Sequence, residues 1–363
     1  MSKSIAEHLN QKANNFDFLR LFAATLVIFS HSYPLTGHAE VPVPFVLNSY
    51  GSLGVKIFFL ISGFLIMSSF LRNPSVVMYF KARILRVIPG LLFALALSSL
   101  VLGPLVSTLS PSDYFNNHQT YDYFKMLFLY SVRYILPGVF EGNVYPQSVN
   151  GSLWTLEYEF TFYIMIAILG VTRLLVDKRV VLFVFFMFLT LTYYQTWLVD
   201  KSVGTIHIRD FFEFGLYFSA GMLLYSFRDY IRIDRLVAIF CVVLLLFSTW
   251  HGGLGPELFV FIGGYLIIYL ALSPDIRLTW VSRFGDFSYG MYIFAFPVQQ
   301  LVVYLNGGTM KSPFMNFIIS FIITLILSII SWHLVEKHAL KLKRISISHL
   351  FRTKFISQDR TVK

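Results

Sequence analysis

The sequence has little charge and almost no cysteine. Only 13% of its 363 residues are charged, about half of the roughly 25% usual in soluble domains. The single cysteine, Cys241, lies in an apolar run, so the chain has neither a disulfide framework nor a cysteine-based metal site. By contrast, 56% of the residues are hydrophobic and 18% are aromatic. This composition excludes a soluble enzyme and a disordered chain, and it indicates a protein whose surface lies in lipid.

Long apolar runs divide the chain into segments that suit a bilayer, whose core requires about 20 helical residues. The fold predicted from them is all-α, a polytopic integral membrane protein with about ten transmembrane helices. The predicted spans are residues 18–35, 53–71, 87–106, 153–171, 180–199, 211–227, 236–250, 258–272, 287–305 and 314–335. No cleavable signal peptide is visible before the first span. Aromatic residues over 121–136 predict a further helix in the outer membrane interface.

The positive charges favour one orientation of these spans, because Lys and Arg collect on the cytoplasmic side of membranes. With the N-terminus in the cytoplasm, most of the 29 Lys and Arg residues fall on that side, and Lys56 falls within a span. The opposite side carries only Lys125, Arg133, Lys201, Arg209 and Lys311. We therefore expect both termini in the cytoplasm, a transmembrane domain over residues 1–340 and a basic tail over 341–363. The net charge of +10 then reflects topology and attraction to anionic membrane lipid, with no nucleic-acid partner.

Two ionisable residues lie in the first span. Arg20 and His31 are eleven residues apart, which is three helical turns, so they share a face about 16 Å apart along the helix axis. Ionisable groups inside a membrane are costly and usually functional. The alternative is structural: Arg20 snorkels to the interface or pairs with Asp17, and His31 forms a hydrogen bond between helices.

The second span combines small residues with one lysine. Gly51, Gly54, Ser62 and Gly63 permit a close approach of neighbouring helices. Ser62 and Lys56 are also candidate substrate-binding residues. The structural alternatives are close packing for Ser62 and a snorkelling anchor at the outer interface for Lys56.

A basic pair follows the second span. Arg83 and Arg86 are three residues apart on a predicted helix and therefore point the same way. Two guanidinium groups together suit a phosphate group. Ordinary positive-inside anchoring is the alternative interpretation.

An aromatic residue and a carboxylate stand together at the start of the fourth span. Trp154 and Glu157 share one helix face at the outer membrane surface. Such a pair suits a sugar, because the ring stacks on the pyranose and the carboxylate accepts hydrogen bonds from hydroxyl groups. The alternative is an interfacial tryptophan beside an exposed carboxylate. Glu159 lies about 200° around the helix from Glu157, so we expect only one of them to face the core.

These four groups of residues, in this order, resemble the acyltransferase-3 family of integral-membrane acyltransferases. The resemblance covers the whole membrane region, and its single motifs are weak while their combination is specific. The matching residues are Arg20 and His31; Gly51, Gly54, Val55, Phe58, Phe59, Ser62, Gly63 and Phe64; Arg83, Arg86 and Pro89; Ser152, Leu153, Trp154, Leu156 and Glu157; and Ser288, Tyr289, Tyr292, Pro297, Ser331 and Glu336. Two positions depart from the family: Ala295 replaces a late histidine, and His338 replaces a proline.

The resemblance implies transfer of an acyl group, often acetyl, from cytoplasmic acyl-CoA to a hydroxyl of a cell-surface or lipid-linked carbohydrate. It also implies a bacterial inner membrane and polysaccharide O-acetylation. We expect His31, Arg20 and Glu157 to be catalytic, Arg83 and Arg86 to bind acyl-CoA without any metal, and Trp154, Lys56 and Ser62 to bind substrate. Histidine suits the base, because its imidazole titrates near neutral pH. The alternative function is a secondary transporter with a relay through His31, Arg20 and Glu157.

The orientation is testable with a reporter that is active only outside the cytoplasm. Fused after Lys363, it should stay silent, because the charge distribution places the C-terminus inside. The matched control is the same reporter inserted between spans three and four, where activity is expected. Strong activity of the C-terminal fusion would contradict the assignment.

Overall fold

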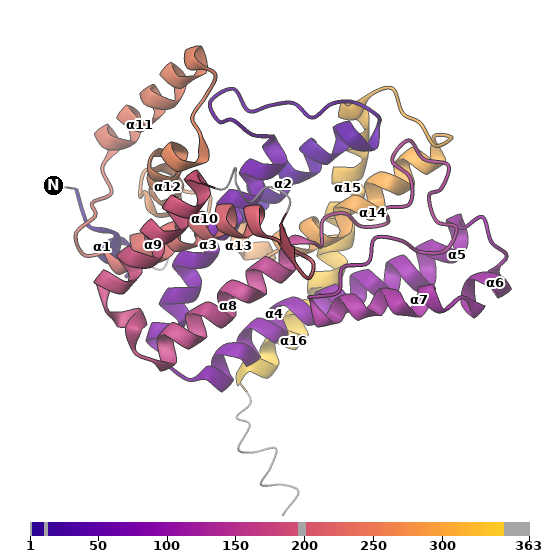
Figure 1. The fold of residues 1–363 in the computed structure, drawn as a ribbon, viewed down its shortest axis with the longest axis horizontal. Coiled ribbons are helices and arrows are strands. Elements are labelled where there is room, and N and C mark those ends of the chain that lie inside the picture. The colour runs from indigo at the N-terminus through magenta and orange to yellow at the C-terminus, as the bar shows by residue number, and fades with distance from the viewer. Residues whose placement is uncertain (1, 11–13, 195–200, 345–363) are drawn as a thin grey trace, which may run out of the picture.

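The computed structural model describes residues 2–10, 14–194 and 201–344, and this part is mostly helical (Figure 1). The long helices are α2 (Phe16–Leu35), α3 (Tyr50–Arg72), α4 (Val76–Ala96), α8 (Thr155–Val171), α9 (Lys178–Tyr193), α10 (Ile208–Ser226), α11 (Arg235–Ser248), α12 (Pro256–Leu272), α14 (Ser288–Leu305) and α15 (Pro313–Ser331). Short α-helices are α1 (Ile5–Leu9), α5 (Gly103–Val106), α6 (Pro111–Asn116), α7 (His118–Asp122), α13 (Trp280–Phe284) and α16 (Lys337–Lys341).

The remaining regular structure is short. The π-helical turns are η1 (Leu97–Leu102) and η6 (Trp332–Glu336). The 3-10 turns are η2 (Tyr123–Phe128), η3 (Leu174–Val176), η5 (Thr249–His251) and η7 (Leu342–Arg344). Two strands, β1 (Ser202–Val203) and β2 (Ile206–His207), form an antiparallel hairpin just before α10.

The helical fold class is confirmed, and every predicted span overlaps a long helix as far as the chain is described, although the span 87–106 begins within α4 and continues through η1 and α5. Within the described part of the chain, four helices are long and apolar enough to cross a membrane: Phe16–Leu35, Tyr50–Arg72, Val76–Val106 and Pro313–Lys341. Together they indicate a membrane protein. The count of ten membrane crossings and the orientation of the termini stay predictions, and residues 345–363 of the predicted tail lie outside the described residues.

The predicted helix over 121–136 is wrong. The chain instead forms the 3-10 turn η2 and continues as irregular backbone through 131–136. Leu129 follows η2 with a φ of 66°, a left-handed conformation that ends the turn. Aromatic spacing alone therefore misidentified this segment.

Helix α3 is the most buried of the four long apolar helices. In its most apolar stretch 78% of the residues are buried, against 28% for Pro313–Lys341. A Cβ atom added to Gly63 would lie 1.9 Å from the carbonyl oxygen of Phe218 in α10, and one added to Gly54 would lie 2.5 Å from that of Ala23 in α2. The close-packing interpretation is thus confirmed at both glycines, and α3 is held between α2 and α10.

Helix α15 has two different faces. Its polar residues are fully buried and recur every three or four positions, facing the protein: Asn316, Ser320, Thr324, Ser328 and Ser331. The opposite face exposes Ile322 and Ile326. Helix α11, at the edge of the molecule in Figure 1, likewise exposes Leu236, Phe240 and Leu246. Large apolar side chains outside and small polar ones inside suit helices surrounded by lipid.

Candidate active site

Three cavities lie along α2, and each is named here after its lining. The arginine cavity, of about 160 Å³, is lined near the start of α2 by Arg20, Arg83 and Arg86. The histidine cavity, of about 370 Å³, contains His31. The loop cavity, of about 820 Å³, lies at the far end of α2 and is lined in part by residues of the 134–151 loop.

The cavities are neighbours because they share side chains. Val55 and Tyr292 line both the arginine cavity and the histidine cavity. The histidine and loop cavities share four residues, namely His31, Glu40, Trp154 and Asp210. His31 therefore lies where a group entering from the loops would meet a group arriving past Val55 and Tyr292.

One carboxylate organises the arginine cavity. Asp286, in the loop before α14, binds Arg20 of α2 at 2.8 Å and Arg86 of α4 at 2.7 Å. Arg20 also binds Asp17 at 2.5 Å. Burial would raise the pKa of Asp286, but the two guanidinium groups outweigh it and hold that pKa well below its ordinary value. Asp286 therefore stays ionised and fixes α2, α4 and α14 to one another.

Arg83 differs from the other two arginines. No carboxylate among the described residues forms an ion pair with it, whereas Arg86 contacts Glu336 at 3.6 Å in addition to Asp286. The Arg83 guanidinium instead lies 6.0 Å and 5.9 Å from the ring centres of Tyr79 and Tyr163. Its positive charge is thus the least compensated in the arginine cavity and the most available to an anion.

A hydrogen-bonded carboxylate lines the same cavity. Glu159 of α8 accepts a hydrogen bond from the Ser62 hydroxyl at 3.0 Å and one from the Tyr163 hydroxyl at 2.5 Å. Ser62, predicted to bind substrate, therefore does line a cavity. Its hydroxyl is already engaged with Glu159.

The imidazole of His31 has no orienting carboxylate. Its Nδ1 atom is buried with no hydrogen-bond partner in the described part of the chain, and its ring meets the edge of Phe296 at 5.3 Å between centroids. His31 nevertheless lines two cavities, so its imidazole borders the space where they join. The structural alternative of a hydrogen bond between helices finds no support among these contacts.

Trp154 and Lys56 have different surroundings. Trp154 lines both the histidine and loop cavities, with its ring held against Tyr158 and Phe214. Lys56 is fully buried, forms an ion pair with Glu213 at 2.7 Å and lines none of the three cavities. Glu213 itself lines the histidine cavity, so Lys56 acts on this space only through its partner.

Glu157 also lies outside all three cavities. It is buried and accepts a short hydrogen bond from Thr205, in the hairpin between β1 and β2. The neighbouring Tyr158 hydroxyl accepts a hydrogen bond from the His207 backbone N–H in the same hairpin. Since His207 lines the loop cavity, this geometry makes Glu157 a support for the cavity wall and gives it no contact with the cavity.

Comparison with known proteins identifies the family of the chain. A family model described as an acyltransferase domain, acyltransferase-3, matches residues 14–333. The chain belongs to the acyltransferase-3 family. It is 28% identical over 335 residues to the O-acetyl transferase of Shigella phage Sf6, covering 91% of this chain and 96% of that protein. It is 36% identical over 179 residues to nodulation protein 10 of Rhizobium leguminosarum bv. viciae, covering 45% and 46% of the two chains. No solved structure matches.

The resemblance stated from the motifs is therefore confirmed, and the chain is an O-acyltransferase. Where the family has its late histidine, Ala295 of this acyltransferase packs against Ala24, Ile28 and Met291 between α2 and α14. Within the described residues, no group of three or more His, Cys, Asp or Glu side chains is arranged to hold a metal ion.

Two features of the site were not found from the sequence. The sequence analysis does not single out Asp286, and the resemblance implies Glu157, not Glu159, as the catalytic carboxylate. The signal for Asp286 was its position directly before the Ser288–Tyr289 motif, whose Ser288 hydroxyl donates to it at 2.5 Å. For Glu159, the signal was the angle of about 200° around the helix axis between Glu157 and Glu159. This angle allows only one of the two carboxylates to lie beside Ser62.

The two carboxylates of α8 form a matched pair for mutation. We expect Glu159→Gln to lower kcat/KM by an order of magnitude or more, because hydrogen bonds to a charged group are worth about 1.5–3 kcal/mol each. Glu157→Gln, which leaves the cavities unchanged, should have the smaller effect. Both effects are measured as kcat/KM for acyl transfer by the purified variants. A larger loss from Glu157→Gln would restore Glu157 as the catalytic carboxylate.

Proposed function

We propose that the protein moves an acyl group, preferably acetyl, from cytoplasmic acyl-CoA to a hydroxyl of an extracytoplasmic or lipid-linked carbohydrate. Its setting would be a bacterial inner membrane that it crosses several times, with residues 1–340 carrying the activity and membrane lipid around them. The observation that carries the proposal is the place of His31, which borders the histidine and loop cavities next to the arginine cavity. The likeness to a phage O-acetyl transferase supports it.

The arginine cavity would bind the donor. Coenzyme A is a polyanion, and Arg83 offers a positive charge that no described carboxylate pairs with. Arg86 and Arg20 would assist by keeping the cavity walls in place through Asp286. The phosphates would remain at this end while the thioester points along α2 toward His31.

The acceptor would enter from the loop cavity. Trp154 presents an aromatic ring to both outer cavities, which suits a sugar ring. Glu40 and Asp210 line the same two cavities and can accept hydrogen bonds from sugar hydroxyl groups. Lys56 would hold Glu213, and Glu157 would hold the 202–207 hairpin, so both predicted residues contribute indirectly.

The chemical step follows from these positions. His31 Nε2 removes the proton from the acceptor hydroxyl while the oxygen attacks the thioester carbonyl carbon. A C–O bond forms, the C–S bond breaks, and the departing thiolate takes the proton from the imidazolium. The products are an ester and free thiol, so no further reactant is needed.

The transporter alternative predicts movement of a solute without covalent change, and the family match does not favour it. Incubation of purified protein with radiolabelled acetyl-CoA and candidate glycans distinguishes the two functions. Label in the glycan supports transfer. Solute counterflow without covalent label supports transport.

His31 provides the sharpest test of the chemistry. His31→Gln keeps a polar side chain that cannot take up a proton, so activity should fall by at least the ~10²–10⁴-fold typical of general-base catalysis. His38→Gln is the matched control, because His38 is exposed and lines none of the three cavities. Near-normal turnover of His31→Gln would place the base elsewhere.

Arg83 provides the test of donor binding. Arg83→Gln should raise the KM for acetyl-CoA by roughly 10- to 100-fold, since a lost charged hydrogen bond costs about 1.5–3 kcal/mol, and leave the acceptor KM nearly unchanged. Arg277→Gln, at an exposed arginine outside the cavities, is the control. An unchanged KM for acetyl-CoA in Arg83→Gln would contradict a role in donor binding and would favour positive-inside anchoring as the role of Arg83.

A further inference from the structure

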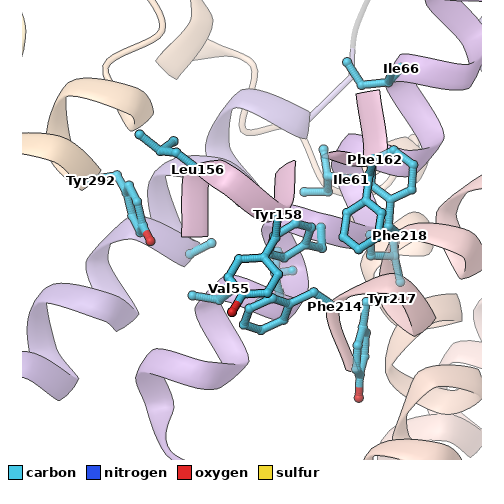
Figure 2. Close-up of a cluster of buried hydrophobic side chains, with 14 of the residues drawn as sticks. Val55, Ile61, Ile66, Leu156, Tyr158, Phe162, Phe214, Tyr217, Phe218 and Tyr292 are labelled. Atoms are coloured by element: carbon cyan, nitrogen blue, oxygen red, sulfur yellow. The ribbon is translucent and has the colours of Figure 1, made fainter. Parts of the chain in front are cut away.

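We propose that Val55 and Tyr292 form a constriction that limits the acyl group to a short chain, and this inference rests on the proposed function. These two side chains line both the arginine cavity and the histidine cavity, so they stand between the donor site and His31. Both belong to the buried apolar core (Figure 2). An acyl group carried by a thioester would have to pass between them.

The Val55 side of the constriction cannot easily retreat. Val55 follows Gly54, whose missing Cβ allows α3 to touch the backbone of α2. At Gly51, one turn earlier, an added Cβ would lie 3.0 Å from the Cβ of Ser30. Since α3 is also pressed against α10 at Gly63, moving Val55 outward would require a shift of three packed helices.

The Tyr292 side is fixed by hydrogen bonds. The Tyr292 hydroxyl donates to the Ser152 carbonyl oxygen at 2.8 Å and lies 2.6 Å from the Thr155 hydroxyl, which can donate to it in turn. The edge of the Phe58 ring packs against the Tyr292 ring at 5.7 Å between centroids. The ring is therefore tied to the start of α8 and is not free to swing aside.

The surroundings of the constriction suit an acyl chain. Phe58 and Leu156 line the arginine cavity together with Val55 and Tyr292, and Phe58 packs against the Tyr292 ring. Phosphates would thus stay with the arginines and only an apolar group would enter the constriction. The acyl carbons would lie between Val55 and Tyr292, and the thioester carbonyl carbon would face the histidine cavity, where the acceptor oxygen attacks it and the C–S bond breaks.

A space enclosed by fixed apolar side chains discriminates by the size of the group that it has to hold. One methylene more or less in a hydrophobic pocket changes kcat/KM by roughly 10- to 200-fold. Acetyl-CoA should therefore be a better donor than butyryl-CoA. Acyl-chain selectivity would then be set by these two side chains and independently of the acceptor.

The experiment compares kcat/KM for acetyl-CoA and butyryl-CoA with one glycan acceptor. Val55→Ala widens the constriction and should lower the acetyl-to-butyryl ratio at least 10-fold. Val55→Ile narrows it and should raise the ratio, which keeps the test decisive if the smaller variant folds poorly. Tyr292→Phe removes both hydrogen bonds while keeping the ring and should also lower the ratio.

Two valines serve as matched controls. Val87 lines only the arginine cavity and Val27 only the histidine cavity, so Val87→Ala and Val27→Ala remove the same atoms on either side of the constriction. Both should leave the acyl ratio unchanged. Equal changes in the controls and in Val55→Ala would overturn the proposal, as would an unchanged ratio in both Val55 variants. If the wild-type protein transfers neither acyl group to any glycan, the proposed function itself fails.

Discussion

The backbone contact of α3 with its two neighbours determines the rest of the site. Gly54 and Gly63 place α3 directly against α2 and α10, closer than any side chain would allow. This contact fixes Val55 and Ser62, which line the arginine cavity, and Lys56, which holds Glu213. In a membrane the apolar lipid supplies no drive for two apolar helices to associate, so close packing and polar contacts have to supply it. The two glycines are therefore the condition for a well-defined cavity in this bundle.

The second constraint is the cost of charge in a low-dielectric interior. Arg20 and Arg86 are accommodated because Asp286 binds both and Asp17 and Glu336 add further compensation. The same carboxylate ties the two arginine-bearing helices to the start of α14, and α14 carries Tyr292. The positions of Arg83, on the same helix as Arg86, and of the Tyr292 ring thus depend on one ion-pair cluster.

Sequence patterns predicted the positions of the helices well, because hydrophobic length is a local property that each span must satisfy by itself. They also placed Arg20, His31, Arg83 and Trp154 along the cavities, since helical spacing fixes which residues share a face. The choice between Glu157 and Glu159 was beyond such patterns, because periodicity says that one of them faces inward but not which one. Asp286 was missed for a related reason: its partner Arg20 is 266 residues away in the chain. The helix predicted over 121–136 is wrong because the aromatic residues there do not form one buried face. Tyr123 and Phe124 pack against the core, whereas the others are exposed, namely Tyr121, Phe128, Tyr130 and Tyr134.

The separation of the arginine cavity from the outer two explains how one site would serve substrates from opposite sides of a membrane. A continuous open channel would let water and ions cross together with the substrates. The apolar pair Val55 and Tyr292 leaves the donor end and the acceptor end in separate cavities, with His31 on the acceptor side. Water that reaches His31 from the loops would compete with the sugar hydroxyl for attack on the thioester. This competition would arise only while an acyl group lies between Val55 and Tyr292. Stacking of the acceptor on Trp154 would displace that water from the same space. Binding of the sugar would therefore also protect the thioester from hydrolysis.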